Sequence, residues 1–211
     1  MALLLPQQSE VLFAYSVLAD LAHLAATRTR LGDIYDLEDW VAEFAFTLRN
    51  ELDYTREGHN ADRFRRNFAG EPSLHVPQVH WGLSTRRVLT MEELQGVKIN
   101  NLAALEAAGL DRRRIAENSV RIMLTEVFQH GFFHADPHPG NFFVLPGEVI
   151  GLMDFGMVGR LDQGLQQALL RLTLAMVRQD SERMVDELLA LGIASGRVQR
   201  QALKRDLDHL V

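Results

Sequence analysis

The stretch Phe133-His-Ala-Asp-Pro-His-Pro-Gly-Asn141, followed by Leu152-Met-Asp-Phe-Gly156, decides the fold and the candidate chemistry of this chain. Asn141 comes five positions after Asp136, and Asp154 comes 18 positions after Asp136. Phosphoryl transfer needs a carboxylate that orients the acceptor and oxygen ligands that hold Mg²⁺ against the phosphates. One amide and one carboxylate suffice, because Mg²⁺ keeps several waters. The spacing therefore predicts Asp136 as a catalytic carboxylate and Asn141 and Asp154 as metal ligands.

The combination of the two segments makes this signal specific. Asp-Phe-Gly alone is a weak pattern, but protein kinases combine it with an aspartate and an asparagine at the same spacing. The alternative is a proline-rich loop whose aspartate and asparagine only cap local turns.

Two histidines in the first segment have competing interpretations. We expect His134 to be structural and His138 to shape the loop between two prolines, although an imidazole can act as a general base near neutral pH. Phe155 and Gly156 are expected to be structural as well. A less favoured alternative is a hydrolytic metal site made by His134, Asp136 and His138, because alternating residues with proline between them rarely converge on one ion.

An acidic segment, Glu51-Leu-Asp-Tyr-Thr-Arg-Glu57, lies on a predicted helix. Asp53 and Glu57 share a face there, and Glu51 lies about a further turn away. One interpretation is a solvated acidic face. The other is the regulatory helix of a kinase, in which Glu57 pairs with a strand lysine that holds the α- and β-phosphates.

The segment Thr90-Met-Glu-Glu-Leu94 is either an ordinary strand end or the connector between two kinase lobes. As a connector, it would contact adenine through the Glu92 carbonyl and the Leu94 amide, and Met91 would line the pocket.

The whole pattern predicts a mainly helical α+β architecture, with a helix pair, a small β-hairpin and a helical body that carries the loop and a second hairpin. The first hairpin joins residues 75–81 and 87–94, with Val76-Pro77 on an edge strand, and the second joins residues 142–145 and 149–153. Helices are expected over 8–30, from Asp36 to Phe68 with a bend or break at Gly58, over 101–108, from the cap Asp111 to His130, and in two or three pieces after Leu161. Core positions expected in the helix after Asp111 are Ile115, Val120, Ile122, Met123 and Val127.

Composition narrows the class of protein. The chain has 211 residues, a formal charge of −6 and no cysteine. The acidity argues against nucleic-acid binding, and the missing cysteines exclude a disulfide framework and a thiolate zinc site. No apolar run reaches the roughly 18–20 residues that a membrane span needs. We expect a soluble protein of the cytoplasm, with peripheral association with a membrane left open.

Three motifs closely resemble those of the UbiB (AarF) family of atypical, protein-kinase-like proteins: Glu51-Leu-Asp-Tyr-x-x-Glu57, His134-Ala-Asp-Pro-His-Pro-Gly-Asn141 and Asp154-Phe-Gly-Met-Val-Gly-Arg-Leu161. The resemblance implies a kinase-like fold, with a remnant of the N-terminal lobe over 1–95 and a helical C-terminal lobe over 96–211.

The resemblance also implies ATP and Mg²⁺ as cofactors. Asp136 becomes the catalytic-loop aspartate, Glu57 the ion-pair glutamate, and Glu51 with Asp53 an acidic pair near the nucleotide. The family points to an ATPase or a lipid-directed kinase tied to ubiquinone and isoprenoid-lipid metabolism. Its expected partners are a nucleotide and an isoprenoid lipid or lipid-biosynthesis proteins.

The chain departs from the family pattern before the acidic helix. A Lys-x-Gly-Gln signature, an Ala-rich phosphate loop and a strand lysine lie there in the family, whereas the only lysines here are Lys98 and Lys204. Losing those groups removes electrostatic positioning on which phosphoryl transfer depends. We therefore expect an N-terminally truncated domain with weak nucleotide binding and little or no turnover. The alternative is a non-catalytic, pseudokinase-like interaction module, or the C-terminal half of a split protein that works with an N-terminal companion fragment.

Overall fold

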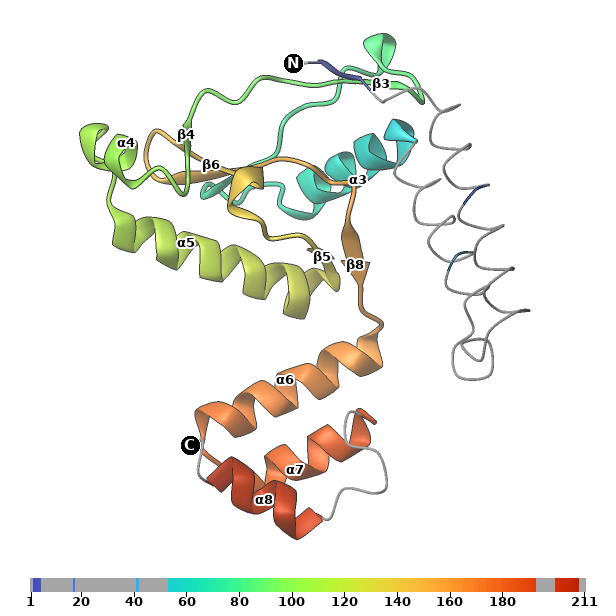
Figure 1. Cartoon of the computed structure of the whole chain (residues 1–211), viewed down its shortest axis with the longest axis vertical. Coiled ribbons are helices and arrows are strands. Elements are labelled where there is room, and N and C mark those ends of the chain that lie inside the picture. The colour runs from blue at the N-terminus through green and yellow to red at the C-terminus, as the bar shows by residue number, and fades with distance from the viewer. Residues whose placement is uncertain (1, 5–16, 18–40, 42–52, 193–199, 209–211) are drawn as a thin grey trace. The chain divides into compact units, whose positions relative to one another are not determined.

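The computed structural model describes residues 2–4, 17, 41, 53–192 and 200–208 (Figure 1). These residues belong to two compact units. The first takes in Met1–Ile115 and Pro137–Met157, and the second takes in Ala116–Asp136 and Val158–Val211. The helix predicted over 8–30, the first part of the next helix, and Glu51 fall outside the described residues, apart from positions 17 and 41.

Helix α3 (Tyr54–Asn67) of the first unit begins at a cap that the sequence pattern did not predict. Asp53 has non-helical angles, φ −127° and ψ 89°, and its carboxylate accepts a hydrogen bond from the amide of Thr55. A residue that caps a helix lies outside the helical region, so the expected continuous helix up to Phe68 is interrupted at Asp53. Gly58 does not interrupt α3. It lies buried inside the helix, and a Cβ there would lie 2.7 Å from the Trp81 ring.

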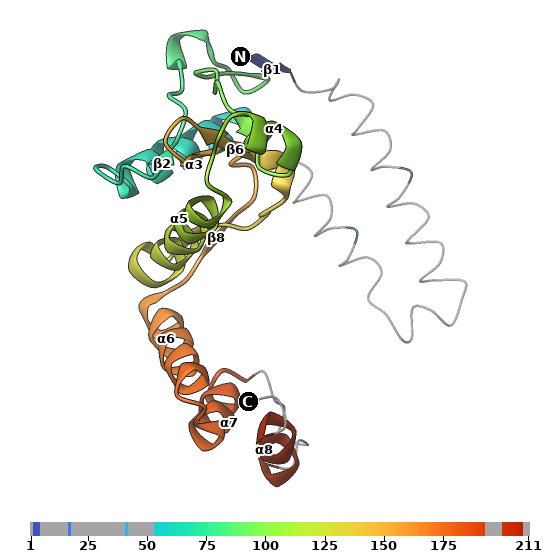
Figure 2. The ribbon, with the colours of Figure 1, turned by 90° about the vertical axis from the view of Figure 1, so that its left-hand side faces the viewer.

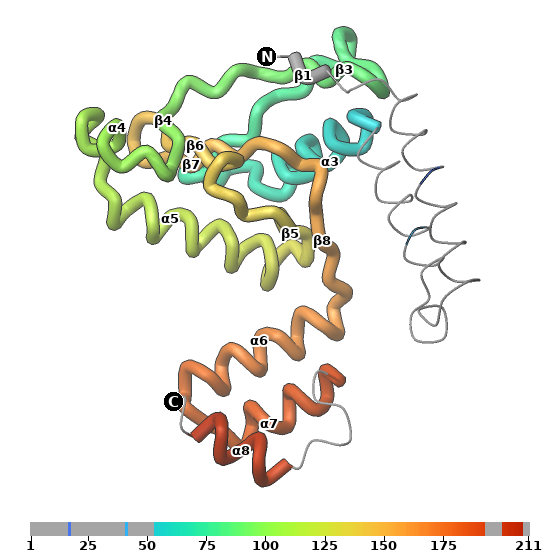
Figure 3. Tube along the Cα trace, in the orientation of Figure 1, coloured from blue at the N-terminus to red at the C-terminus, as the bar shows by residue number. Residues whose placement is uncertain are grey.

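The hairpin predicted between residues 142 and 153 is confirmed, and Figure 3 shows its two strands side by side. Strands β6 (Phe142–Leu145) and β7 (Val149–Leu152) pair antiparallel, with Phe142 opposite Leu152. Two short strands extend this sheet in the order β2-β7-β6-β4. These are β2 (Leu74–His75), parallel to β7, and β4 (Val97–Lys98), antiparallel to β6.

The hairpin predicted from residues 75–81 and 87–94 forms in part. The two runs pair antiparallel at one bridge among the described residues, between Val79 and Met91. Backbone hydrogen bonds of 2.8 Å flank it, from the amide of His80 to the carbonyl of Thr90 and from the amide of Glu92 to the carbonyl of Gln78. Strand β3 (Val88–Thr90) also pairs with β1 (Ala2–Leu4), a partner that was not predicted.

Short elements complete the first unit. Helix α4 (Leu102–Ala107) forms where it was predicted and is capped by the side chain of Asn101. Two 3₁₀ turns are η1 (Trp81–Leu83) and η3 (Pro139–Asn141). The core gathers apolar side chains from α3, β3, the four-stranded sheet and the segments that follow β3 and β7, among them Ala61, Phe64, Leu74, Leu89, Met91, Val144, Ile150, Leu152 and Phe155.

Helix α5 (Arg112–Leu124) begins in the first unit and continues in the second. The predicted cap is confirmed, because Asp111 accepts a hydrogen bond from the amide of Arg113 at 2.8 Å. Its buried stripe is narrower than predicted: Ile115 and Ile122 are buried, Val127 is half-buried, and Val120 and Met123 are 56% and 53% exposed. Residues three to four positions apart share a helix face, so Glu126 rather than Met123 extends the stripe.

The helical run ends near Gly131, as predicted, but its last turn is a π-helix, η2 (Thr125–His130). Gly131 has φ +56°, and a Cβ there would lie 2.8 Å from the Leu161 carbonyl oxygen. The side-chain amide of Gln166 donates to the carbonyl of Val127 at 2.9 Å. The turn is therefore fixed from outside by the segment around residue 166.

The second unit also holds a two-stranded sheet and three helices, which agrees with the prediction of two or three helices after Leu161. Strands β5 (Phe132–His134) and β8 (Val158–Arg160) pair antiparallel. Figures 1 and 2 show α7 beside α6 and α8 beside α7. The helices are α6 (Gln163–Val177), α7 (Ser181–Ala190) and α8 (Arg200–Asp208). In the part of the chain that the structure describes, no helix is both long and apolar enough to cross a bilayer.

Candidate functional site

The two predicted metal ligands lie at the same end of the β6–β7 hairpin in the first unit. The amide of Met153 donates to the carbonyl of Asn141 at 2.9 Å, one step beyond the Phe142–Leu152 pair. On the loop side, the amide of Asn141 donates to the carbonyl of His138 at 2.9 Å. The register of the hairpin therefore places Asn141 and Asp154 at the same end.

Asp154 has an unusual backbone conformation that is fixed by its neighbours. Its φ is +60°, in the left-handed region that few residues other than glycine adopt. Phe155 is fully buried with its ring 5.1 Å from that of Phe64, and its carbonyl accepts a hydrogen bond from Asn60 at 2.9 Å. Strained residues of this kind persist where the surroundings over-determine them, and here α3 supplies both anchors. The predicted structural role of Phe155 agrees with this packing.

The exposed Asp154 carboxylate accepts one local hydrogen bond, from the amide of Gly156 at 3.2 Å. Its second oxygen has no partner among the described residues. A carboxylate that is exposed and half-satisfied at the end of a rigid hairpin is able to bind a cation.

The described acidic residues of the segment, Asp53 and Glu57, have different environments at the start of α3. Asp53 caps the helix and also pairs with Arg86 at 3.2 Å. The hydroxyl of Thr55 above all, and then Arg86, hold the pKa of Asp53 below its usual range. Glu57, by contrast, is buried with 7% of its surface exposed. The alternative of a solvated acidic face therefore does not hold for Glu57.

The connector segment lies between β3 and β4 of the first unit. Met91 is buried with 1% exposure, and the carboxylate of Glu92 bonds His75 and the amide of Gln78, both at 3.1 Å. Among the residues described, neither the carbonyl of Glu92 nor the amide of Leu94 has a hydrogen-bond partner. The Leu94 side chain packs on β7, where a Cβ at Gly151 would meet it at 2.9 Å.

Asp136 lies in the second unit, at the end of a chain of buried hydrogen bonds. The amide of Asp136 donates to Nδ1 of His134 at 3.2 Å, and the amide of His134 donates to Oε2 of Glu126 at 3.0 Å. Both His134 and Glu126 are buried. This burial is consistent with the structural role expected for His134, and the convergence of Asp136 with the two ligands remains a prediction from the sequence.

Glu126 was not identified from the sequence. Burial raises the pKa of its carboxyl from 4.5 to about 7, against the opposing effect of the hydrogen bond from His134. Its position four residues after Ile122 was an available signal, because that spacing places it on the buried face.

The alternative metal site of His134, Asp136 and His138 gains no support. No group of three histidine, aspartate or glutamate side chains that could hold a metal ion occurs within the described residues. Nδ1 of His138 accepts the amide of Gly140 at 3.1 Å, as Nδ1 of His134 accepts that of Asp136. The proposed shaping role of His138 is consistent with this turn.

Comparison with known proteins gives these features a family context. The family model described as the ABC1 atypical kinase-like domain matches residues 9–188. Protein ACTIVITY OF BC1 COMPLEX KINASE 7, chloroplastic, from Arabidopsis thaliana is 40% identical over 171 residues, which cover 80% of this chain and 25% of that protein. Probable protein kinase UbiB from Marinobacter nauticus is 41% identical over 162 residues, which cover 75% of this chain and 29% of that protein.

A solved structure extends the comparison to three dimensions. The complex of Rv3197 with erythromycin from Mycobacterium tuberculosis matches with a TM-score of 0.59 at 24% identity, over 82% of this chain and 44% of that chain. This likeness shows a shared fold. The curated relatives are longer, and the chain spans about a third or less of their length.

Proposed function

The chain belongs to the ABC1 atypical kinase-like family, and on this premise we propose that it binds a magnesium–nucleotide complex and takes part in phosphoryl transfer or ATP hydrolysis. The observation that carries the proposal is the hydrogen bond of 2.9 Å between the Asn141 carbonyl and the Met153 amide. It joins the backbones of residues 141 and 153, so that Asn141, with an amide side chain, and Asp154, with a carboxylate, lie at the same end of the hairpin. These are the oxygen donors that Mg²⁺ prefers.

The residues fit a magnesium ion. Asp154 offers a carboxylate oxygen that no described residue occupies, and Asn141 would supply the second protein ligand. When bound, Mg²⁺ would neutralise charge on the phosphates and so favour attack by the acceptor. Waters and phosphate oxygens would complete its coordination.

The connector provides groups for a nucleobase. Adenine presents a donor and an acceptor along one edge, and the Glu92 carbonyl with the Leu94 amide offers the complementary pair. Met91 would line the pocket behind them. In this arrangement residues 1–95 correspond to the N-terminal lobe and 96–211 to the C-terminal lobe.

The rest of the proposed machinery acts through the chain's own side chains. Asp136 orients the acceptor, which is water or a lipid-like hydroxyl, and accepts its proton. His134 and Glu126 hold the backbone before Asp136 by the hydrogen bonds described above. Glu57 is proposed as the ion-pair glutamate, and Asp53 with Glu51 as the acidic pair of the family.

The proposed affinity is low, because lysines are scarce in this chain. Lys204 bonds Glu182 on the helical end of the second unit, and Lys98 lies on β4 after the connector. Neither occupies the place of a strand lysine before the acidic helix. We propose a link to isoprenoid-lipid metabolism, with peripheral membrane association, on the strength of the UbiB-named relatives alone.

Calorimetric titration with Mg·ATP tests the proposal. We expect weak, metal-dependent binding that Asp154→Asn lowers about tenfold or more, since a charge-assisted contact is worth about 1.5–3 kcal/mol. Asp206→Asn is the matched control, because it removes the same charge from an exposed position on α8. Equal binding by wild type and Asp154→Asn would contradict the metal role. Absence of binding by the wild type would favour a non-catalytic interaction module.

A further inference from the structure

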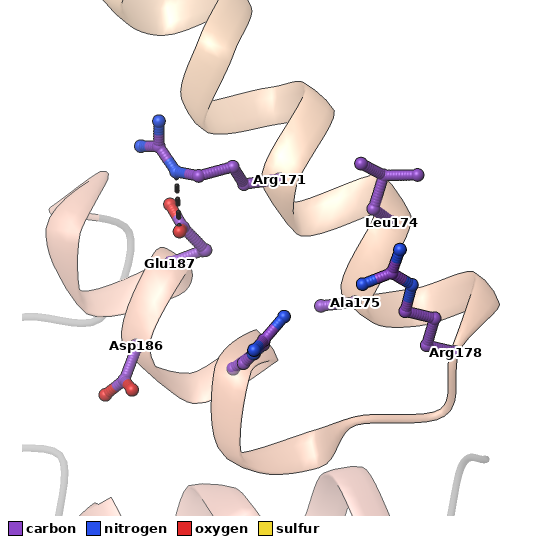
Figure 4. A pocket seen from close by; sticks show the side chains of 7 residues that line it. Arg171, Leu174, Ala175, Arg178, Asp186 and Glu187 are labelled. Carbon is purple, nitrogen blue, oxygen red and sulfur yellow. Dashed lines mark hydrogen bonds and ion pairs between the residues drawn. The ribbon is translucent and has the colours of Figure 1, made fainter.

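A cavity of about 260 Å³ lies between α6 and α7 of the second unit (Figure 4). Arg171 and Arg178 line it from the α6 side, and Arg183, Asp186 and Glu187 line it from α7. None of these residues belongs to the nucleotide machinery proposed above. The volume is smaller than the roughly 300–1,000 Å³ of sites for drug-sized ligands, so the cavity suits a small molecule.

The arginines of this cavity are unequally neutralised. Arg171 pairs with Glu187 at 2.7 Å, and Asp186 is engaged from α8 by Arg200. Arg183 has an exposed pair with its near neighbour Asp180 at 3.3 Å, and exposed pairs of this kind contribute little. The guanidinium of Arg178 has no hydrogen bond or ion pair with any described residue.

Glu187 adds a second unsatisfied group to the same cavity. One carboxylate oxygen accepts from Arg171, as the dashed line in Figure 4 marks. The other, Oε2, is buried and lacks a hydrogen-bond partner in the described part of the chain. Buried polar atoms are nearly always paired, and one left unpaired is destabilising. A hydroxyl donor, supplied by water or by a ligand, therefore fits beside this oxygen.

We propose that this cavity binds a small phosphate compound that also carries a hydroxyl group, such as a glycerol or sugar phosphate. The phosphate would be bound by Arg178 and Arg183, because the guanidinium fork matches phosphate oxygens in pairs. The hydroxyl would donate to Oε2 of Glu187. One ligand would then satisfy both groups that the protein leaves unpaired.

The donor is a neutral hydroxyl rather than an ammonium group. Three arginines face two carboxylates around the cavity, which leaves an excess of positive charge. A cationic donor would be repelled by that excess, whereas a phosphate dianion is attracted by it. This excludes amino acids as the preferred class and favours hydroxylated phosphates.

Titration calorimetry with glycerol 3-phosphate at low ionic strength tests the assignment. We expect saturable binding that Arg178→Gln and Arg183→Gln each weaken about tenfold, the loss typical of one charge-assisted contact. Arg205→Gln on α8 is the matched control, because it removes an exposed arginine of the same unit that lies outside the cavity. Far-UV circular dichroism of each variant confirms that it is folded.

One further ligand and one further variant separate the possible outcomes. Methyl phosphate lacks the hydroxyl and should bind more weakly than glycerol 3-phosphate, and equal binding would overturn the role of Glu187. Asp154→Asn should leave the titration unchanged, and loss of binding there would place the phosphate at the nucleotide site instead. No binding, or equal binding by wild type and Arg178→Gln, would overturn the proposal.

Discussion

The buried carboxyl of Glu126 makes the stability of the second unit depend on pH. Its pKa is raised from 4.5 to about 7 by burial, so the folded protein holds a proton that the unfolded chain releases between these values. The contribution of Glu126 to stability is therefore most favourable below pH 4.5 and falls as the pH rises towards 7. The difference corresponds to about 3 kcal/mol, since one pH unit is worth about 1.4 kcal/mol.

Glu126→Gln removes the charge but keeps an oxygen that accepts the amide of His134. The variant resembles the protonated glutamic acid, so we expect it to match wild type near pH 4 and to exceed it by about 3 kcal/mol at pH 8. Urea unfolding followed by far-UV circular dichroism between pH 4 and 8 measures this difference. Parallel stability curves for the two proteins would refute the reasoning.

A second variant separates the charge from the hydrogen bond. Glu126→Leu also removes the charge, but it leaves the amide of His134 buried without its acceptor, which costs about 1–3 kcal/mol. We expect this cost at every pH, so the Leu variant should fall below the Gln variant by a constant amount. A gap that changed with pH would show that another titrating group contacts the amide.

Two predictions concern helix α3. Gly58→Ala should destabilise the first unit by about 1–3 kcal/mol through overpacking, because the new Cβ would lie 2.7 Å from the Trp81 ring. A red shift of Trp81 fluorescence in a Trp40→Phe background measures the displacement of the ring, and an unchanged spectrum would contradict the prediction. Asp53→Ala should cost about 0.5–2 kcal/mol by removing the cap, whereas Asp53→Ser should keep most of it. Since the pKa of Asp53 is lowered in the folded protein, its carboxylate stabilises the fold above the unfolded pKa of 3.8, and this stabilisation is lost as the pH falls further. Urea titrations should therefore show a smaller difference in unfolding free energy between wild type and Asp53→Ala at pH 3 than at pH 7.

Features that a few neighbouring residues encode were predictable from the sequence. The β6–β7 hairpin follows from two apolar runs around Pro146-Gly147-Glu148, and the start of α5 follows from the cap at Asp111. Gly131 also indicates where the helical run ends, because glycine adopts its φ of +56° without strain, although the contacts from the segment around residue 166 were not predicted. The placement of Asn141 and Asp154 at one hairpin end follows from the same register.

Pairings between distant segments were not predictable. The parallel pairing of β2 with β7 and the pairing of β3 with β1 join segments separated by more than 70 residues. The apolar pattern gives each run a buried face but does not select its partner. The hydrogen bond from the Thr90 amide to the Ser84 hydroxyl was not predictable either, because no periodicity in the sequence indicates such a side-chain bond.

Which residues are buried on the helical run before Gly131 was also predicted only in part. Hydrophobic periodicity assigned Val120 and Met123 to the core of α5, and both are more than half exposed. Glu126 was passed over because a glutamate is usually a surface residue, yet it is buried where it accepts the His134 amide. The buried backbone amide of His134 needs a hydrogen-bond acceptor, and the Glu126 carboxyl supplies one. The cost of burying this carboxyl is reduced because it is protonated below its raised pKa of about 7. The residue that contradicts the apolar pattern is therefore the one that joins the helical run to the loop carrying Asp136, so a polar residue on an apolar helix face marks a buried hydrogen bond to a neighbouring segment.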